Sequence, residues 1–158
     1  MTGSEARLRQ FNSAGQIVLM VGVIVKDMDE TIGFLTSMGI GPFGMPGGKK
    51  WVEVSFNGEL RGKPAAWKVR ISNAQLGNGE LELLQPSGGP SLLQEFLDEH
   101  GEGLHHIGYL TANLDKDIKT LAEQGVKVLT SANADKGGFA YFDTDIHGGI
   151  VTELRQLK

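Results

Sequence analysis

The sequence predicts an α+β protein in which two βαβββ modules pair, so that their sheets form a cup. An internal repeat carries this prediction, because residues 20–25 align with residues 106–111 at an offset of 86 positions. The alignment continues without a gap through the next segment, as far as Gly39 in the first copy and Gly125 in the second. Repetition at a fixed offset indicates one structural unit used twice.

Each copy opens with a strand and continues with a helix. Residues 21–25 form an apolar, β-branched run, which is typical of a buried strand. Asp27 and, in the second copy, Asn113 are suited to cap the helix that follows. Gly39 and Gly125 come where each helix ends, and glycine readily adopts the left-handed conformation needed there.

Further strands complete each module. In the first copy we expect them at residues 50–56, 67–71 and 79–84, and in the second at 127–129, 139–142 and 150–154. A segment that opens with Pro90 and Ser91 predicts a linker helix over residues 90–100. The expected organisation is an N-terminal tail (1–15) and one domain (16–158), with module one at 16–86, the linker helix at 90–100 and module two at 104–157.

The overall composition excludes several classes of protein. The chain has 158 residues, of which 40% are hydrophobic and 22% charged, with a net charge of −4. It lacks the basic block that nucleic acid or an anionic membrane surface would require. Because there is no cysteine, disulfides and thiolate metal ligands are excluded, which fits a cytoplasmic protein. No apolar run approaches the length of a membrane span, about 20 residues.

Four positions are expected to face the cup. Met20 and His106 are equivalent in the repeat, and Glu82 and Glu153 both begin a Glu-Leu pair in the last strand of their modules. A buried carboxylate needs a partner or a metal ion, so this grouping points to a functional site. His105 is the neighbour of His106 on one strand and is expected to point to the opposite face.

Several segments resemble the vicinal oxygen chelate superfamily of glyoxalases, bleomycin resistance proteins and dioxygenases, and methylmalonyl-CoA epimerases in particular. The resemblance covers roughly residues 16–157, and its most specific part is the string Gly-Glu-Gly-Leu-His-His-Ile at residues 101–107. Residues 21–27, the Glu-Leu-Leu-Gln-Pro string at 82–86 and the closing Glu153-Leu154 are typical of the wider superfamily. The resemblance implies a glyoxalase-like fold and a homodimer.

The resemblance also implies a divalent metal held by one residue from each of four strands. Carried over to this sequence, the ligands are Glu82, His106 and Glu153, with Met20 at the fourth position. Imidazole and carboxylate together suit Zn, Ni, Co, Mn or Fe. Met20 departs from the His or Gln that family members usually have, and a thioether is a poor ligand for such a site. Met20 is therefore expected to line the substrate pocket, and the metal could be absent.

The resemblance leaves more than one function open. The first is a metal-dependent isomerase, epimerase or lyase that acts on a small carbonyl compound or an acyl-CoA through an enolate, with Glu153 or Glu53 as the catalytic carboxylate. The alternative is a non-catalytic protein that binds a small molecule, such as an antibiotic, in the same cup, which the apolar Met20 favours. A ring-cleaving dioxygenase fits least, since such iron sites usually need two histidines.

Overall fold

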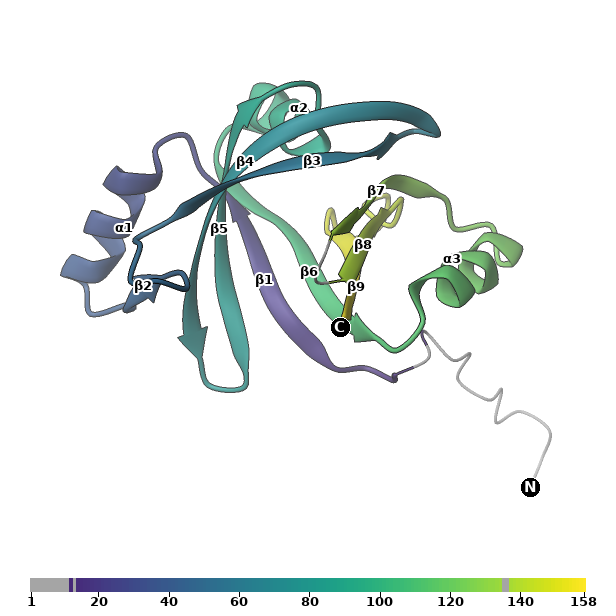
Figure 1. Ribbon diagram of the computed structural model, residues 1–158, viewed down its shortest axis with the longest axis horizontal. Helices are drawn as coiled ribbons and strands as arrows, with labels where there is room; N and C mark the ends of the chain where they lie inside the picture. Colours follow the sequence, from purple (N-terminus) through teal and green to yellow (C-terminus); the bar gives the residue numbers. More distant parts are fainter. Residues whose placement is uncertain (1–11, 13, 135–136) are drawn as a thin grey trace.

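A computed structural model describes residue 12 and residues 14–134 and 137–158, so most of the expected tail (1–15) lies outside the described residues. This part of the chain contains three helices and nine strands (Figure 1). In chain order they are β1 (Val18–Ile24), α1 (Met28–Ser37), β2 (Phe43–Gly44), β3 (Val52–Leu60), β4 (Lys63–Leu76), β5 (Gly79–Gly88), α2 (Leu92–His100), β6 (Gly103–Thr111), α3 (Leu114–Glu123), β7 (Val128–Ala134), β8 (Gly137–Phe142) and β9 (Val151–Leu157).

The helices begin and end where the repeat predicts. The side chain of Asp27 accepts a hydrogen bond from the backbone N–H of Glu30 at the start of α1, and Asn113 accepts one from Lys116 at the start of α3. Gly39 and Gly125, just beyond the two helices, have φ values of 88° and 82°. These local signals fix both helices at equivalent places in the two modules.

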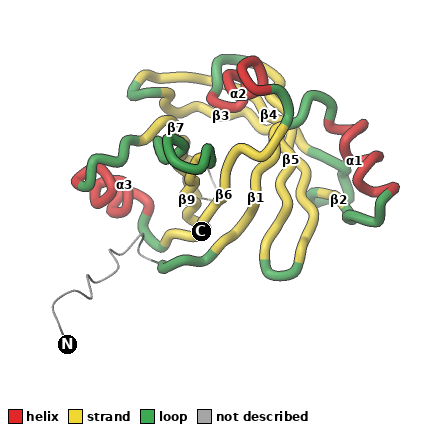
Figure 2. Tube along the Cα trace, turned by 180° about the vertical axis from the view of Figure 1, so that it is seen from behind, coloured by secondary structure: helices red, strands yellow, loops and turns green. Residues whose placement is uncertain are grey.

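The sheet joins the two modules and curls back on itself. β1 pairs antiparallel with β6 at the centre, β5 runs parallel to β1, and β9 runs parallel to β6. A short pairing between β3 and β7 and a longer one between β4 and β5 close the ring. The predicted α+β cupped sheet is thus confirmed, and Figure 2 shows its curvature from behind.

The helices cover different parts of this sheet. α1 packs with Leu83 of β5 on the convex side of module one, and α3 packs with Phe142 and Leu154 on that of module two. α2 packs through Leu92 and Leu93 on the aromatic core of the cup. None of the helices described here is long and apolar enough to cross a membrane.

Several local features differ from the sequence-based expectation. β2 is only two residues long, too short for any periodicity to reveal it. Residues 57–63, for which no strand is expected, extend β3 and β4 into a long hairpin whose turn contains Arg61 and Gly62. Arg61 has a φ of 49° and Gly62 one of 78°, which suits a tight two-residue connection.

Candidate metal centre

Glu82, His106 and Glu153 meet inside the cup. The Nε2 atom of His106 lies 3.2 Å from Oε2 of Glu153 and 3.9 Å from Oε1 of Glu82. One possible ligand atom from each residue falls within 4.8 Å of the others. All three side chains are buried, with 0–1% exposure. The structure therefore brings together all three residues that the resemblance implies as metal ligands.

The register of the strands explains this convergence. In the antiparallel pair β1–β6, Gly22 lies opposite His106 and Met20 lies opposite Gly108. In the two parallel pairs, Gly22 lies beside Glu82 and Gly108 beside Glu153. Met20 of module one therefore lies across from Gly108 of module two, and His106 of module two lies across from Gly22 of module one. Each glutamate lies beside the glycine of its own module.

Glycine is needed at positions 22 and 108 because the side chains of His106 and Met20 occupy the space that a Cβ atom would take there. A Cβ atom on Gly22 would lie 2.1 Å from Cε1 of His106, and one on Gly108 would lie 1.8 Å from Sδ of Met20. The same point at Gly108 lies 2.9 Å from Oε2 of Glu153. The thioether of Met20 is therefore a neighbour of the carboxylate, and Met20 forms a buried wall of the site, with 2% exposure.

Arg155 holds the outer side of both carboxylates. Its Nη2 and Nε atoms donate to Oε1 of Glu153 at 2.8 and 3.1 Å, and its Nη1 donates to Oε2 of Glu82 at 3.4 Å. The other oxygen of each carboxylate is left facing His106. Sequence reasoning missed Arg155, although a residue two positions from Glu153 on the same strand must share its face.

His105 supports His106 from the other ring nitrogen. The two Nδ1 atoms lie 2.8 Å apart, and both rings are buried. The register of β6 against β1 shifts between Gly22 and Val23, so that β6 has an extra residue there. This bulge disturbs the strict alternation of side chains and corrects the expectation that adjacent histidines stay apart on opposite faces.

The surroundings strongly shift the pKa values of His105, His106 and Glu153. Burial, aided by the neighbouring His106, lowers the pKa of His105 to about 3. Burial also disfavours the charged form of His106, yet the two nearby carboxylates of Glu153 and Glu82 prevail and raise its pKa to about 9. For Glu153, burial opposes ionisation, but the positive charge of Arg155 and the nearby ring of His106 lower its pKa to about 2.

The unused atoms fit a divalent metal ion. Oε1 of Glu82, Nε2 of His106 and Oε2 of Glu153 are buried, and none has a hydrogen-bond partner among the described residues. Buried polar atoms without hydrogen-bond partners are uncommon, and they indicate a place for an ion or a water molecule. One imidazole nitrogen and two carboxylate oxygens form a donor set that suits Zn, Ni, Co, Mn or Fe.

Aromatic side chains fill the cup beside these residues. Phe56, Trp67 and Tyr141 line a cavity of about 20 Å³ together with Arg155. The ring of Tyr141 lies 4.8 Å from that of His106, centre to centre. A cavity of this size holds roughly one water molecule, so a larger ligand requires these side chains to move.

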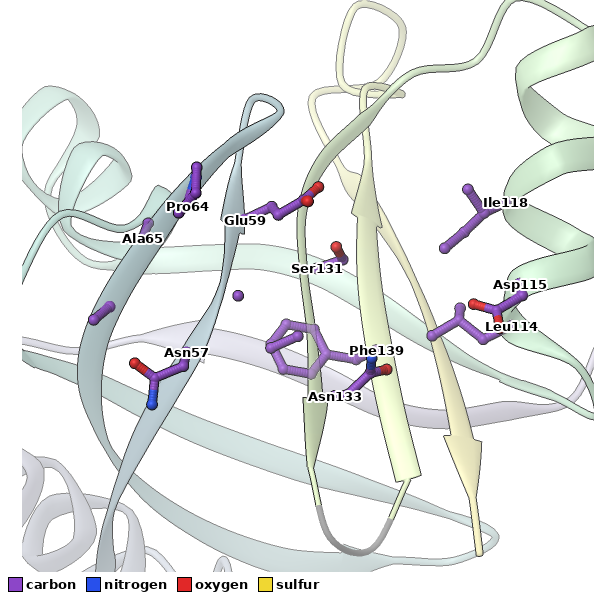
Figure 3. A pocket seen from close by; sticks show the side chains of 13 residues that line it. Asn57, Glu59, Pro64, Ala65, Leu114, Asp115, Ile118, Ser131, Asn133 and Phe139 are labelled. Atoms are coloured by element: carbon purple, nitrogen blue, oxygen red, sulfur yellow. The ribbon is translucent and has the colours of Figure 1, made fainter.

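A larger hollow lies away from this chemistry. It has a volume of about 720 Å³ and lies between the β3–β4 hairpin and α3, over β7 and β8 (Figure 3). None of the three candidate ligands lines it. Its ionisable residues are Glu59 and Asp115, which provide no cluster for acid-base or metal chemistry. Chemistry, rather than volume, therefore locates the candidate site in the cup.

Glu53 does not join the site. It lies on β3 in an alternating pattern with Val52 and Val54, and its side chain is 38% exposed. Its nearest charged partner is Arg70, whose Nε lies 3.5 Å from Oε2 of Glu53. Phe56, three positions further along β3, packs into the cup, so Glu53 belongs to the opposite face of the strand.

Comparison with known proteins agrees with this fold. The chain belongs to the glyoxalase/bleomycin resistance protein/dioxygenase superfamily, whose family model matches residues 20–142. YqjC of Bacillus subtilis is 31% identical over 96 residues, which are 58% of this chain and 67% of YqjC. The mitochondrial methylmalonyl-CoA epimerase of Bos taurus is 30% identical over 93 residues, which are 56% of this chain and 53% of that protein.

Solved structures show the same fold over more of the chain. A variant of the Streptomyces coelicolor methylmalonyl-CoA epimerase, in complex with 2-nitronate-propionyl-CoA, superposes with a TM-score of 0.63 at 23% identity. The match covers 90% of this chain and 94% of that one. The fold is therefore shared over nearly the whole length of both proteins.

Proposed function

We propose that the protein is a divalent-metal-dependent isomerase, epimerase or lyase that acts on a small carbonyl compound or an acyl-CoA. The observation that carries this proposal is the convergence of three buried, partnerless ligand atoms from Glu82, His106 and Glu153. A protein that binds only apolar molecules has no need of such a cluster, which is costly to bury. Membership of the superfamily and the similarity to methylmalonyl-CoA epimerases support the same class of chemistry.

The residues of the cup have different roles in this proposed reaction. A bound divalent ion would polarise the carbonyl group of a substrate and so acidify the adjacent C–H. Glu153 is our candidate for accepting and returning that proton, a role that requires its Oε2, which no protein group holds, to leave the ion. Its low pKa makes it a weak base, which suits a substrate whose proton is already acidified. The aromatic wall excludes water from the reacting atoms.

Two further expectations belong to this proposal. The family resemblance suggests a homodimer, and the lack of cysteine fits a cytoplasmic location. Glu53 is not included as a catalytic group, since it lies on the outer face of β3. It provides a useful control instead.

The test is the metal content of the purified protein, measured by elemental analysis. We expect about one divalent ion per chain in the wild type and in Glu53→Gln, and loss of the ion in Glu82→Gln and Glu153→Gln. These substitutions change charge but hardly change shape. Failure of the wild type to bind Zn, Ni, Co or Mn when each is supplied would refute the proposal.

A non-catalytic binding protein is the second candidate, and Met20 is the observation that favours it. Its thioether adds apolar surface to a cup already lined by Phe56, Trp67 and Phe139. Deuterium exchange distinguishes the two functions. An isomerase of this class should exchange the proton next to the carbonyl of a thioester substrate with D₂O, and Glu153→Gln should abolish that exchange. A binding protein exchanges nothing in either form.

A further inference from the structure

The charge of the centre does not balance once an ion is bound. Glu82 and Glu153 contribute two negative charges, which the charge of a divalent ion cancels. His106 is neutral when it is a metal ligand. Arg155, bonded to both carboxylates, then remains as one uncompensated positive charge within the cluster.

The geometry of Arg155 leaves this charge available to a ligand. A guanidinium group has five N–H donors, and the hydrogen bonds to Glu82 and Glu153 use three of them. Among the described residues, no other acceptor is seen for the remaining N–H groups of Nη1 and Nη2. The side chain is 28% exposed, whereas the candidate ligands are completely buried.

Arg155 also lies between the ligands and the cavity. It lines the small cavity formed with Trp67 and Tyr141, and the three candidate ligands do not. A molecule that enters this cavity therefore meets Arg155 beside the centre. In a buried environment, a hydrogen bond from a charged donor to an anionic oxygen is stronger than one to a neutral oxygen.

We propose that Arg155 is a specificity-determining residue that makes the metal-loaded centre select ligands with an anionic oxygen. This inference rests on the proposed function, and it narrows the substrate class. The preferred substrates are small carbonyl compounds that also carry a carboxylate. Neutral carbonyl compounds of the same shape should bind more weakly.

The test compares formate with formamide, two ligands of equal size that differ in charge. Protein loaded with Co²⁺ is titrated with each, and binding is followed by the visible absorption of the ion. The wild type should prefer formate. Arg155→Met should keep Co²⁺ but lose this preference, with formate binding weakened about tenfold or more and formamide binding unchanged. Arg155→Lys keeps the positive charge but lacks the planar guanidinium group with its paired N–H donors, so it should retain part of the preference for formate.

Arg70→Met is the matched control. Arg70 is 37% exposed and pairs with Glu53 on the outer face, so its loss changes the net charge equally but leaves the cup intact. The inference is overturned if Arg155→Met still prefers formate, or if it loses Co²⁺ altogether, since Arg155 would then serve only to hold the carboxylates. A wild type that takes up no Co²⁺ refutes the proposed function itself, which separates the two failures.

Discussion

At the scale of single residues, His106 is held through both ring nitrogens. Nε2 faces the two carboxylates, and Nδ1 lies 2.8 Å from Nδ1 of His105. If Nε2 binds an ion, the ring proton must lie on Nδ1, and that N–H then donates a hydrogen bond to Nδ1 of His105. The low pKa of His105 keeps that ring neutral and able to accept. Such an outer partner fixes the tautomer and the orientation of a metal-binding histidine.

The proton on His106 gives a prediction for the stability of the metal-free protein. In the folded state its pKa is about 9, raised from 6.5 by Glu153 and Glu82 against the effect of burial. Between these pH values the folded state binds a proton that the unfolded state does not. This contribution to stability is fully present below pH 6.5 and is lost as the pH rises to 9. The free energy of unfolding, measured with urea in the presence of a chelator, should fall over this interval.

The same proton competes with a metal ion for Nε2. Metal affinity should therefore rise with pH by roughly tenfold per unit and level off above the pKa of His106. Titration with Zn²⁺ at several pH values measures this slope. A metal affinity that is independent of pH in this range would show that His106 is not a ligand.

Met20 leads to a prediction about the missing fourth ligand. Its Sδ lies beside Oε2 of Glu153, near the other candidate ligands. An imidazole at this position should add a nitrogen ligand, so Met20→His should bind Zn²⁺ about tenfold more tightly than the wild type. Met38→His, on a side chain that is 59% exposed, is the control and should change nothing. Unchanged affinity in Met20→His would mean that this side of the site is closed to the ion.

The residue scale also shows what the sequence could predict. The repeat and the family resemblance indicate Glu82, His106 and Glu153, because these positions are equivalent in the two modules or match the family's motifs. This reasoning does not identify Arg155, because the equivalent residue in the first module, Leu84, is apolar. The contact of His105 with His106 depends on a bulge, which has no periodic signal in the sequence.

At the scale of elements, the central pair β1–β6 is constrained by the two glycines that face large side chains. Gly22→Ala would place a methyl group 2.1 Å from the ring of His106. The buried ring cannot move without disturbing both carboxylates. We expect a loss of about 1–3 kcal/mol in the free energy of unfolding, as for other overpacked cores. Metal affinity should fall as well.

Gly33→Ala in α1 is the matched control for this substitution. No atom lies within 4 Å of the added methyl group, and Gly33 has no positive φ. Alanine in an exposed helix should increase stability by about 0.5–1 kcal/mol. Urea unfolding of the two variants measures both effects. Equal effects of the two substitutions would contradict the steric role of Gly22.

Elements with strong local signals could be predicted from the sequence, and others could not. Asp27 and Asn113 mark the starts of α1 and α3 because capping is a local interaction. The length of the β3–β4 hairpin depends on contacts with β7, far away in the sequence. Its alternating pattern weakens near residues 57–63, where small and polar residues carry no hydrophobic period.

At the scale of the whole molecule, the cup depends on a short closing pairing. β3 and β7 pair over only three positions, Gly58–Leu60 with Ala132–Thr130, whereas β1 and β6 pair along most of their length. Two further contacts support this closing pairing. The hydroxyl group of Thr130 donates to the backbone oxygen of Glu59, and the backbone N–H of Arg61 donates to the backbone oxygen of Leu129. The pairing joins the two modules at the rim of the cup, so it is the place where the sheet can most easily open.

Gly58 allows the two strands to approach at this rim, which leads to a prediction for the whole fold. A Cβ atom there would lie 2.1 Å from the backbone oxygen of Ser131, so Gly58→Ala must separate β3 from β7. The backbone N–H groups of residues 58–60 and 130–132 should then exchange faster with D₂O, while those of β1 and β6 stay protected. Gly88→Ala in β5, where the nearest atoms lie at 3.9 Å, is the control and should leave exchange unchanged.

If the cup admits ligands by opening at this rim, Gly58→Ala should also let formate reach the Co²⁺-loaded centre faster. Faster exchange at the rim without faster binding would place the entrance elsewhere, among the aromatic residues beside Arg155.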